Sequence, residues 1–137
     1  MKFISRDTDY AVRALLYIAR AYSKDKDCVV VVDDIVKGER LPERFLRRIL
    51  QKLARHKILY SYKGKDGGFS LSRSPKEIRF TDIINIFQGE IDLTNCLLKG
   101  LKCPNIKKCA LRKKLKKISK KLSGELERIT VASLLKG

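Results

Sequence analysis

The sequence contains few of the residues that enzymes usually need. It has no tryptophan, one methionine and one histidine in 137 residues. It has only 15 Asp and Glu residues, compared with 32 Lys and Arg. The carboxylates are scattered, no cysteine stands in register with the histidine, and no glycine-rich phosphate loop is present. An acid–base or nucleophilic centre therefore lacks its building blocks. We expect no enzymatic activity and no small-molecule substrate.

Long apolar runs are absent as well. No stretch approaches the roughly 20 apolar residues that span a bilayer. Charged side chains interrupt the N-terminal stretch that would be apolar in a signal peptide, at Arg6, Asp7, Asp9 and Arg13. We therefore expect a cytoplasmic protein without a membrane partner. In that compartment the four cysteines are metal ligands or redox thiols more often than disulfide partners.

Positive charge is the property that the sequence has in excess. The formal net charge is +17, and the hydrophobic fraction of 44% indicates a globular protein instead of a disordered basic tail. This charge predicts binding to a polyanion, and nucleic acid is a better candidate than an anionic membrane. A lysine-rich thermophile surface usually carries abundant glutamate as well, which this chain lacks.

The first part of the chain has the pattern of helices separated by short connections. Apolar residues at helical spacing predict a helix over Thr8–Tyr22, with Ser5 or Asp7 as its N-cap. The segment "CVVVV" then predicts a short extended stretch. Asp33 is expected to cap a short helix that Gly38 ends.

A longer, basic helix is predicted directly after the short helix of Asp34–Lys37. Pro42 suits its first turn, because proline lacks an N–H and has a fixed φ. The predicted apolar face comprises Phe45, Leu46, Ile49, Leu50 and Leu53, and the polar face Arg44, Arg47, Arg48, Gln51, Lys52 and Arg55. Two helices joined by a tight turn, the second with a basic outer face, are typical of a helix-turn-helix.

The next segment, "ILYSYKGKDGGFSLS", predicts a β-hairpin. Its residues alternate with period two around a glycine-rich tip that contains Gly67 and Gly68. A hairpin directly after a helix-turn-helix is a wing. Lys63 and Lys65 at its tip are suited to follow phosphates or to enter a minor groove. A winged helix-turn-helix over Asp33–Ser72 predicts duplex DNA binding, although some winged helices serve as protein-interaction modules instead.

The second half predicts a short helix from about Thr81 to Gly89, after a turn at Ser74–Pro75, and a long C-terminal helix. An apolar seam with steps of three and four residues comprises Leu111, Leu115, Ile118, Leu122, Leu126 and Ile129. Such a narrow seam is most simply buried against the same helix of a second copy. The predicted fold is mainly α-helical with a small β-hairpin wing. We assign 1–90 to the winged helix-turn-helix DNA-binding domain, 91–109 to a cysteine loop that binds a cluster, and 110–137 to a dimerisation helix and a C-terminal segment.

Three of the four cysteines, Cys96, Cys103 and Cys109, lie within one lysine-rich stretch of 14 residues. Their spacings match neither the paired ligands of structural zinc sites nor the ferredoxin motifs. Wide, nearly even spacing fits a loop around something larger than one ion, such as an iron–sulfur cluster. Thiol-based redox sensing and incidental burial remain alternatives. Cys28, outside this stretch, is expected to be a packed thiol, and His56 to contact a helix dipole or a phosphate.

Taken together, these segments resemble the Rrf2 family of bacterial transcription regulators, which includes the iron–sulfur cluster regulator and the nitric-oxide-sensing repressor. The resemblance covers "ISRDTDYAVRALLYIA", "IVKGERLPERFLRRILQKLARHKIL", "YKGKDGGFSLS", "IRFTDIINIFQGE" and "ITVASLL", with the three cysteines. The family's wing usually reads Arg-Gly-x-x-Gly-Gly-Tyr. The family also commonly has Glu-Gly where this chain has Gln88 and Gly89.

The resemblance implies a homodimer that binds palindromic promoter DNA and holds a [2Fe-2S] or [4Fe-4S] cluster on Cys96, Cys103 and Cys109. The fourth ligand varies within the family. Some members use a histidine at the position of Arg112 here. Others use an acidic residue of the first helix of the partner subunit, and Asp9 stands at that position.

The resemblance also implies DNA contacts. Pro42, Arg44 and Arg47 match the family's helix contacts, and Lys63 matches its wing arginine, although one member has a carboxylate in place of Arg47. The complete predicted DNA-binding set is Pro42, Arg44, Arg47, Arg48, Gln51, Lys63, Lys65, Gly67 and Gly68. The expected function is a transcription regulator that senses iron, redox or nitric oxide status. The alternatives are a regulator that senses by thiol oxidation or zinc, and a non-specific nucleic-acid-binding protein.

Overall fold

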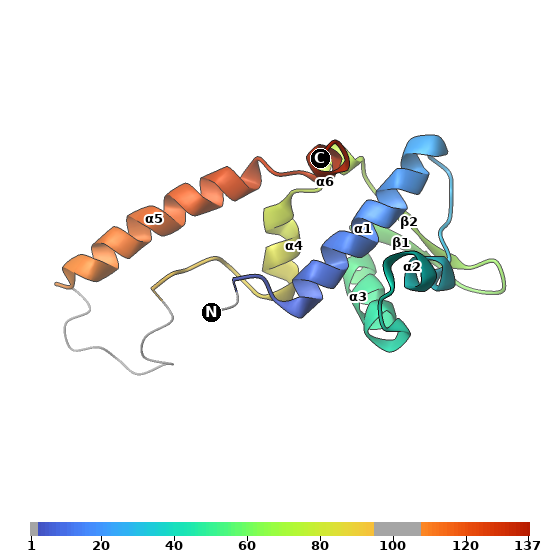
Figure 1. Ribbon diagram of the computed structural model, residues 1–137, viewed down its shortest axis with the longest axis horizontal. Coiled ribbons are helices and arrows are strands. Elements are labelled where there is room, and N and C mark those ends of the chain that lie inside the picture. The colour runs from blue at the N-terminus through green and yellow to red at the C-terminus, as the bar shows by residue number, and fades with distance from the viewer. Residues whose placement is uncertain (1–2, 95–107) are drawn as a thin grey trace.

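The computed structural model describes residues 3–94 and 108–137, in which helices and one two-stranded hairpin follow each other along the chain (Figure 1). The helices are α1 (Arg6–Lys24), α2 (Val32–Glu39), α3 (Glu43–Arg55), the 3-10 turn η1 (Pro75–Glu77), α4 (Phe80–Phe87), α5 (Ala110–Glu127) and α6 (Val131–Leu135), and the strands are β1 (Leu59–Tyr62) and β2 (Gly68–Leu71). The predicted fold class, mainly helical with a small hairpin, is confirmed.

Helix α1 forms the centre of the core. Its N-cap is Ser5, as predicted, whose Oγ accepts a hydrogen bond from the Thr8 N–H at 3.2 Å. Because apolar residues recur at helical spacing, one face of α1 is fully buried. Leu15 and Ile18 on this face lie in the same cluster as Leu50 of α3. This packing fixes the position of α3 relative to the N-terminus of the chain.

Helix α2 continues beyond its predicted end. We expected Gly38 to end it, but the helix includes Gly38 and ends at Glu39, and its C-cap residue Arg40 adopts a left-handed conformation with φ 53°. A Cβ on Gly38 would lie 2.5 Å from the Tyr17 ring, so glycine here permits the close approach of α2 to α1. Asp33 lies in the first turn, and Val31 occupies the N-cap position. The predicted cap was therefore wrong by two residues.

Two expectations for α3 and its surroundings also change. Pro42 is the N-cap residue and does not lie in the first turn, because its ψ of 124° is extended. Phe45 was assigned to the apolar face, but it is 41% exposed and its ring lies 5.3 Å from the Arg48 guanidinium carbon. The extended segment before α2 pairs only through Val30, which exchanges backbone hydrogen bonds with Phe69 at 2.8 and 2.9 Å.

The predicted wing is confirmed as an antiparallel hairpin. Leu59 of β1 pairs with Leu71 of β2, and Tyr62 pairs with Gly68 at the tip end. A Cβ on Gly68 would lie 2.3 Å from the Val30 carbonyl oxygen. Only glycine lets the hairpin lie this close to the segment before α2.

The chain returns to the core after α5. We expected the long helix to include Ile129, but α5 ends at Glu127. The Ile129 carbonyl accepts a hydrogen bond from the Phe80 N–H at 2.8 Å, and the Val131 N–H donates to the Ile78 carbonyl at 2.9 Å. These bonds replace the helical pattern with a short extended crossing, so Ile129 does not belong to the seam of the long helix.

Helix α5 projects away from the rest of the molecule (Figure 1). Only Ser119 is buried, and its Oγ accepts a hydrogen bond from the Leu93 N–H at 3.1 Å. The α5 seam comprises Leu111, Leu115, Ile118, Leu122 and Leu126. Within it, Leu111 is 55% exposed and Ile118 is 51% exposed. No helix in the described part of the chain has the length and apolar character needed to cross a membrane.

Candidate DNA-binding surface and cysteine site

The structure places four of the predicted DNA-binding and basic residues of α3 on one exposed stripe. Arg44, Arg48, Gln51 and Arg55 are separated by three or four residues, which puts them on the same side of a helix. All four are exposed, and the opposite side is buried in the core. The core packing of α3 therefore presents a row of donors to the outside, where a duplex can reach them.

Arg47 lies on the flank of this stripe and pairs with Glu43 one turn earlier. Its Nη2 and Nε donate to one carboxylate oxygen of Glu43 at 2.9 and 3.0 Å. Both side chains are about half exposed, and such exposed helical pairs contribute about 0.3–0.5 kcal/mol. The Arg47 guanidinium can therefore leave Glu43 at little cost when an anion or a base edge is available.

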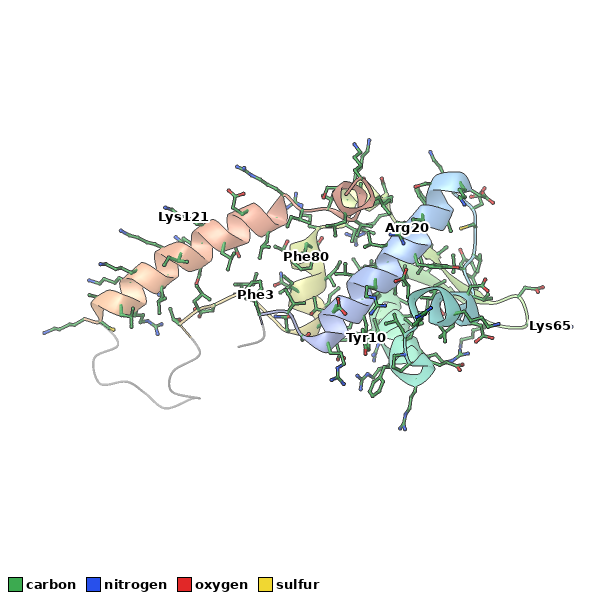
Figure 2. All side chains as sticks on the ribbon, in the orientation of Figure 1. Phe3, Tyr10, Arg20, Lys65, Phe80 and Lys121 are labelled. Atoms are coloured by element: carbon green, nitrogen blue, oxygen red, sulfur yellow. The ribbon has the colours of Figure 1, made fainter. Side chains whose placement is uncertain are left out.

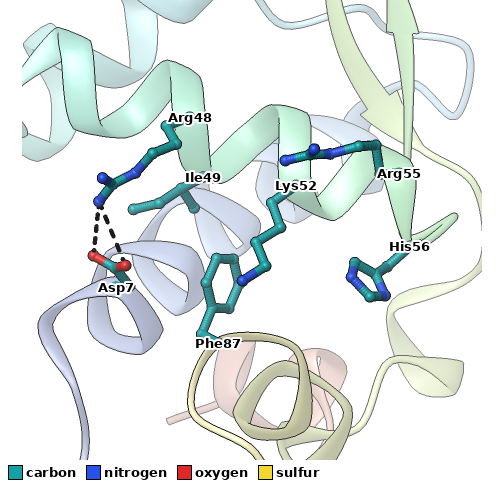
Figure 3. Close-up of a pocket in the computed structure, with 7 residues that line it drawn as sticks. All are labelled: Asp7, Arg48, Ile49, Lys52, Arg55, His56 and Phe87. Atoms are coloured by element: carbon teal, nitrogen blue, oxygen red, sulfur yellow. Dashed lines mark hydrogen bonds and ion pairs between the residues drawn. The ribbon is translucent and has the colours of Figure 1, made fainter.

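Arg48 connects α3 to the first turn of α1. Its Nη2 lies 3.4 Å from both carboxylate oxygens of Asp7 (Figure 3). The guanidinium also lies over the Phe45 ring. Asp7 is two residues from Asp9, the candidate cluster ligand. Helix α3 and the candidate ligand are thus joined through one turn of α1.

The wing places its two lysines away from the body. Lys63 and Lys65 are exposed, and Lys65 stands at the outer end of the hairpin (Figure 2). Gly68 is buried and Gly67 partly so. A Cβ on Gly67 would lie 2.3 Å from the Tyr62 carbonyl oxygen. Both glycines have a structural reason to be present, whether or not their backbones also contact DNA.

The cysteine site is only partly within the described residues. Cys96 and Cys103 lie outside them. Cys109 is the N-cap residue of α5 and is partly exposed. Among the described residues, no group of three or more His, Cys, Asp or Glu side chains is arranged to hold a metal ion. The described part of one chain therefore does not bring Cys109 and Asp9 together in such a group.

Asp9 lies on α1 at the edge of an apolar groove. Its carboxylate is 57% exposed and lies 3.9 Å from the Arg13 guanidinium. The groove has a volume of about 450 Å³ and is lined by Asp9 together with Ile4, Val12, Phe80, Ile129 and Leu134. An exposed carboxylate at the rim of an apolar groove is accessible to a group delivered from outside this chain.

The residues that lead into the cysteine segment are influenced by the positive charge of α5. At the start of this segment, the Thr94 backbone N–H and Oγ1 donate to Asp92 at 2.8 and 2.6 Å. These bonds lower the pKa of Asp92, and the positive charges of Arg112 and Lys116 on α5 lower it further. The carboxylate of Asp92 therefore lies within the electrostatic influence of two cations of α5.

A side-chain latch at Gln88 was not found by sequence reasoning. Gln88 Oε1 accepts hydrogen bonds from the Ser5 N–H at 2.9 Å and from Thr8 Oγ1 at 2.8 Å. Its Nε2 donates to the Phe3 carbonyl at 2.8 Å. The latch ties the end of α4 to the beginning of α1. The only signal in the sequence was the departure from the family's Glu-Gly at this position.

Cys28 and His56 are the remaining candidates from the sequence. Cys28 packs against the core. Burial raises the pKa of its thiol, and the negative charge of Asp25 nearby raises it further. His56 is the C-cap residue of α3. It also lines a cleft with residues of α1, α3 and α4, which sequence reasoning did not anticipate.

A helix-turn-helix followed by a hairpin, with a basic stripe on the second helix, defines a winged-helix DNA-binding protein. The family model "Rrf2: Iron-dependent Transcriptional regulator" matches residues 4–137. The chain therefore belongs to the Rrf2 family of transcriptional regulators and is not an enzyme. Both the family resemblance and the expected class of function are confirmed.

Individual relatives support the same conclusion. A protein of Aquifex aeolicus (strain VF5) described as an HTH-type transcriptional regulator is 30% identical over 128 residues, which are 92% of this chain and 86% of that protein. Protein aau3 of Rhizobium meliloti (strain 1021) is 28% identical over 134 residues, 97% of this chain and 84% of that protein.

Solved structures support the fold. The structure of CymR, the global cysteine regulator of B. subtilis, superposes with a TM-score of 0.79 at 21% identity, covering 99% of this chain and 98% of that one. The structure of T. potens IscR superposes with a TM-score of 0.75 at 24% identity, covering 99% of this chain and 87% of that one. At these identities the likeness shows the winged-helix fold alone.

Proposed function

We propose that this regulator senses iron, redox or nitric oxide status through an iron–sulfur cluster held by Cys96, Cys103 and Cys109. The observation that carries the proposal is the position of these cysteines. Their segment joins the DNA-binding body to the exposed helix α5, and its last cysteine is the N-cap of that helix. A change in this segment would therefore act on both the body and α5.

The donor set fits an iron–sulfur cluster. Thiolates are the usual protein ligands of such clusters, and three thiolates leave one position for another donor. The partner subunit's Asp9 is a suitable fourth ligand, because this carboxylate is exposed and, among the described residues, its one ion pair is the 3.9 Å contact with Arg13. Exposed pairs of this kind contribute about 0–1 kcal/mol and are easily given up. When bound, a cluster would supply a redox-sensitive centre at this point.

The active form is a homodimer. The α5 seam presents large apolar side chains such as Leu111 and Ile118 to the outside, and the groove at Asp9 is also largely apolar. Burying both surfaces against a second copy would stabilise the dimer by about 25 cal/mol for each Å² of apolar surface removed from water. A twofold axis would place two DNA-binding stripes on one side of the assembly.

The dimer binds palindromic promoter DNA. Each α3 enters the major groove at a half-site, and half-sites about 34–36 Å apart match one turn of the duplex. Pro42, Arg44, Arg47, Arg48 and Gln51 contact bases or phosphates from the helix, and Lys63, Lys65, Gly67 and Gly68 do so from the wing.

The sensing segment and α3 are coupled through α1. Gln88, at the end of α4 and shortly before the cysteine segment, is hydrogen-bonded to Ser5 and Thr8 at the beginning of α1. Asp7 in the first turn of α1 pairs with Arg48 of α3. Ordering or releasing the segment changes the position of this turn and thereby the angle between the two copies of α3. Only one of the two arrangements matches the half-site spacing.

Anaerobic purification tests the cluster. The wild-type protein is expected to be brown, with visible absorbance and with bound iron and sulfide. Cys96→Ser, Cys103→Ser and Cys109→Ser should lose the colour, whereas the matched control Cys28→Ser should keep it. Asp9→Ala should alter the spectrum or speed iron loss, and Asp33→Ala should not. Colourless wild-type protein that contains zinc would contradict the proposal and favour the thiol or zinc alternative.

A footprint on the protein's own promoter tests the DNA proposal. Protection of a palindromic site is expected at concentrations that leave flanking DNA unprotected. Arg44→Gln should weaken this protection, because Arg44 lies on the exposed stripe of α3. Equal binding to random duplex and to RNA would favour a non-specific nucleic-acid-binding protein instead.

A further inference from the structure

A cleft of about 580 Å³ lies between α1, α3 and α4 (Figure 3). Three of its side chains, Lys52, Arg55 and His56, come from the C-terminal half of α3. Asp7 of α1 and Phe87 of α4 form the facing walls, and Arg48 closes one end through its pair with Asp7.

The cleft carries unbalanced positive charge. Asp7 is the only carboxylate among the side chains that line it, and it is already paired with Arg48 at 3.4 Å. Lys52 and Arg55 then remain without a carboxylate in the lining. The Lys52 Nζ lies 5.3 Å from the centre of the Phe87 ring, which holds the ammonium group in place without neutralising it. An anion in the cleft would relieve the repulsion between these cations.

The position of the cleft indicates where an anion would come from. Arg48 and Arg55 belong both to the cleft and to the exposed stripe of α3, so the cleft opens beside the surface proposed to face DNA. An α-helix with its side chains is about 10–12 Å wide and the major groove is about 12 Å wide. The flank of a helix in that groove therefore faces the phosphates of the groove wall.

We propose that this cleft is a phosphate-binding site that holds one phosphate of the DNA backbone beside each α3. Lys52 supplies a point charge held beside the Phe87 ring, Arg55 supplies N–H donors, and His56 supplies a ring N–H from the lining of the cleft. The contact is independent of base sequence and sets the depth and register of α3 in the groove. The proposal rests on the placement of α3 in the major groove proposed above.

The salt dependence of duplex binding tests this site. Binding of a random-sequence duplex is measured by fluorescence anisotropy between about 50 and 200 mM salt. The slope of log K against log salt is negative, and each lost phosphate contact reduces its magnitude by about 0.9. Lys52→Gln and Arg55→Gln should each weaken binding and flatten the slope. Lys120→Gln on α5 makes the same change in net charge and should leave the slope near that of the wild type. Thermal unfolding verifies that each variant is folded.

Two further measurements distinguish a failure of the cleft proposal from a failure of the proposed placement of α3: binding by Arg44→Gln and titration with inorganic phosphate. If Arg44→Gln weakens binding but Lys52→Gln and Arg55→Gln behave like Lys120→Gln, the cleft proposal is overturned and the placement of α3 stands. If Arg44→Gln also has no effect, the placement of α3 is overturned with it. Titration with inorganic phosphate, followed by NMR of the His56 ring, identifies a free anion as the ligand. Saturation below about 1 mM with an unchanged duplex slope would overturn the assignment to DNA.

Discussion

The winged-helix body and helix α5 use apolar residues in different ways. In the body, residues such as Leu15, Ile35 and Leu50 are fully buried against one another. In α5 the apolar residues are just as regularly spaced, yet Ser119 is its one buried residue and Ile118 is half exposed. The body completes its core within one chain, whereas α5 presents an exposed seam that a second chain would cover in the proposed dimer. Regular spacing alone does not distinguish these two cases.

Core truncation in the body should have the largest effect on stability. Leu50→Ala is expected to lower the free energy of unfolding by about 2–5 kcal/mol, because it removes a fully buried side chain and leaves a cavity. Leu111→Ala on the α5 seam should act only through dimerisation, so its effect should depend on protein concentration. Urea unfolding at several protein concentrations separates the two. A concentration-independent loss for Leu111→Ala would contradict the comparison.

Two glycines sharpen the same contrast. Gly68→Ala should destabilise the body by roughly 1–3 kcal/mol, because the new Cβ would lie 2.3 Å from the Val30 carbonyl oxygen and backbone must move. Gly124→Ala should stabilise α5 by about 0.5–1 kcal/mol, since nothing lies within 4 Å and alanine favours a helix. Thermal unfolding should give shifts of opposite sign. Shifts of the same sign would count against this account.

Loss of the Gln88 latch, which joins the end of α4 to the beginning of α1, should have an intermediate effect on stability. Gln88→Ala removes three hydrogen bonds, to Ser5, Thr8 and Phe3, and should cost about 1–2 kcal/mol because these groups are only partly buried. Gln88→Glu keeps the acceptor for Ser5 and Thr8 but removes the donor to Phe3, so its loss of stability should be smaller. Hydrogen exchange in the first turn of α1 should rise in Gln88→Ala. Unchanged exchange there would show that the latch does not hold α1.

The smallest effect is expected at Asp92, which is fully exposed. Hydrogen bonds from Thr94 lower its folded pKa below the ordinary value of about 3.9. The carboxylate therefore contributes stability above about pH 4, and this contribution is lost as the pH falls through the lowered pKa. Asp92→Asn and Thr94→Val should both flatten the acid side of the stability curve, measured by thermal unfolding between about pH 2 and 6. An acid limb as steep as that of the wild type in both variants would contradict this assignment.

Sequence reasoning succeeded where the structure depends on local pattern. The helical period located α1 and α3, and alternation around glycines located the wing, because these signals come from residues close together in the chain. The predicted end of α2 was wrong because Gly38 does not end the helix. It leaves room for the ring of Tyr17, which lies elsewhere in the sequence. The end of α5 was wrong because Ile129 keeps the helical spacing while its backbone bonds to Phe80.

The candidate site was predictable to a similar degree. The exposed stripe of α3 follows from helical spacing and charge alone. The latch at Gln88 and the cleft beside Lys52 depend on the meeting of α1, α3 and α4, and no local pattern contains that meeting. Of the proposed cluster ligands, Cys109 and Asp9 lie within the described residues, and Cys96 and Cys103 lie outside them.

Native mass spectrometry of the anaerobically purified protein tests the central claim most directly, because one spectrum reports both the number of chains and any bound cluster. The account predicts a species of twice the 15.7 kDa chain mass with the added mass of iron and sulfide, and loss of that added mass in Cys109→Ser. A species of one chain mass, or a dimer whose mass equals that of two bare chains, would contradict it.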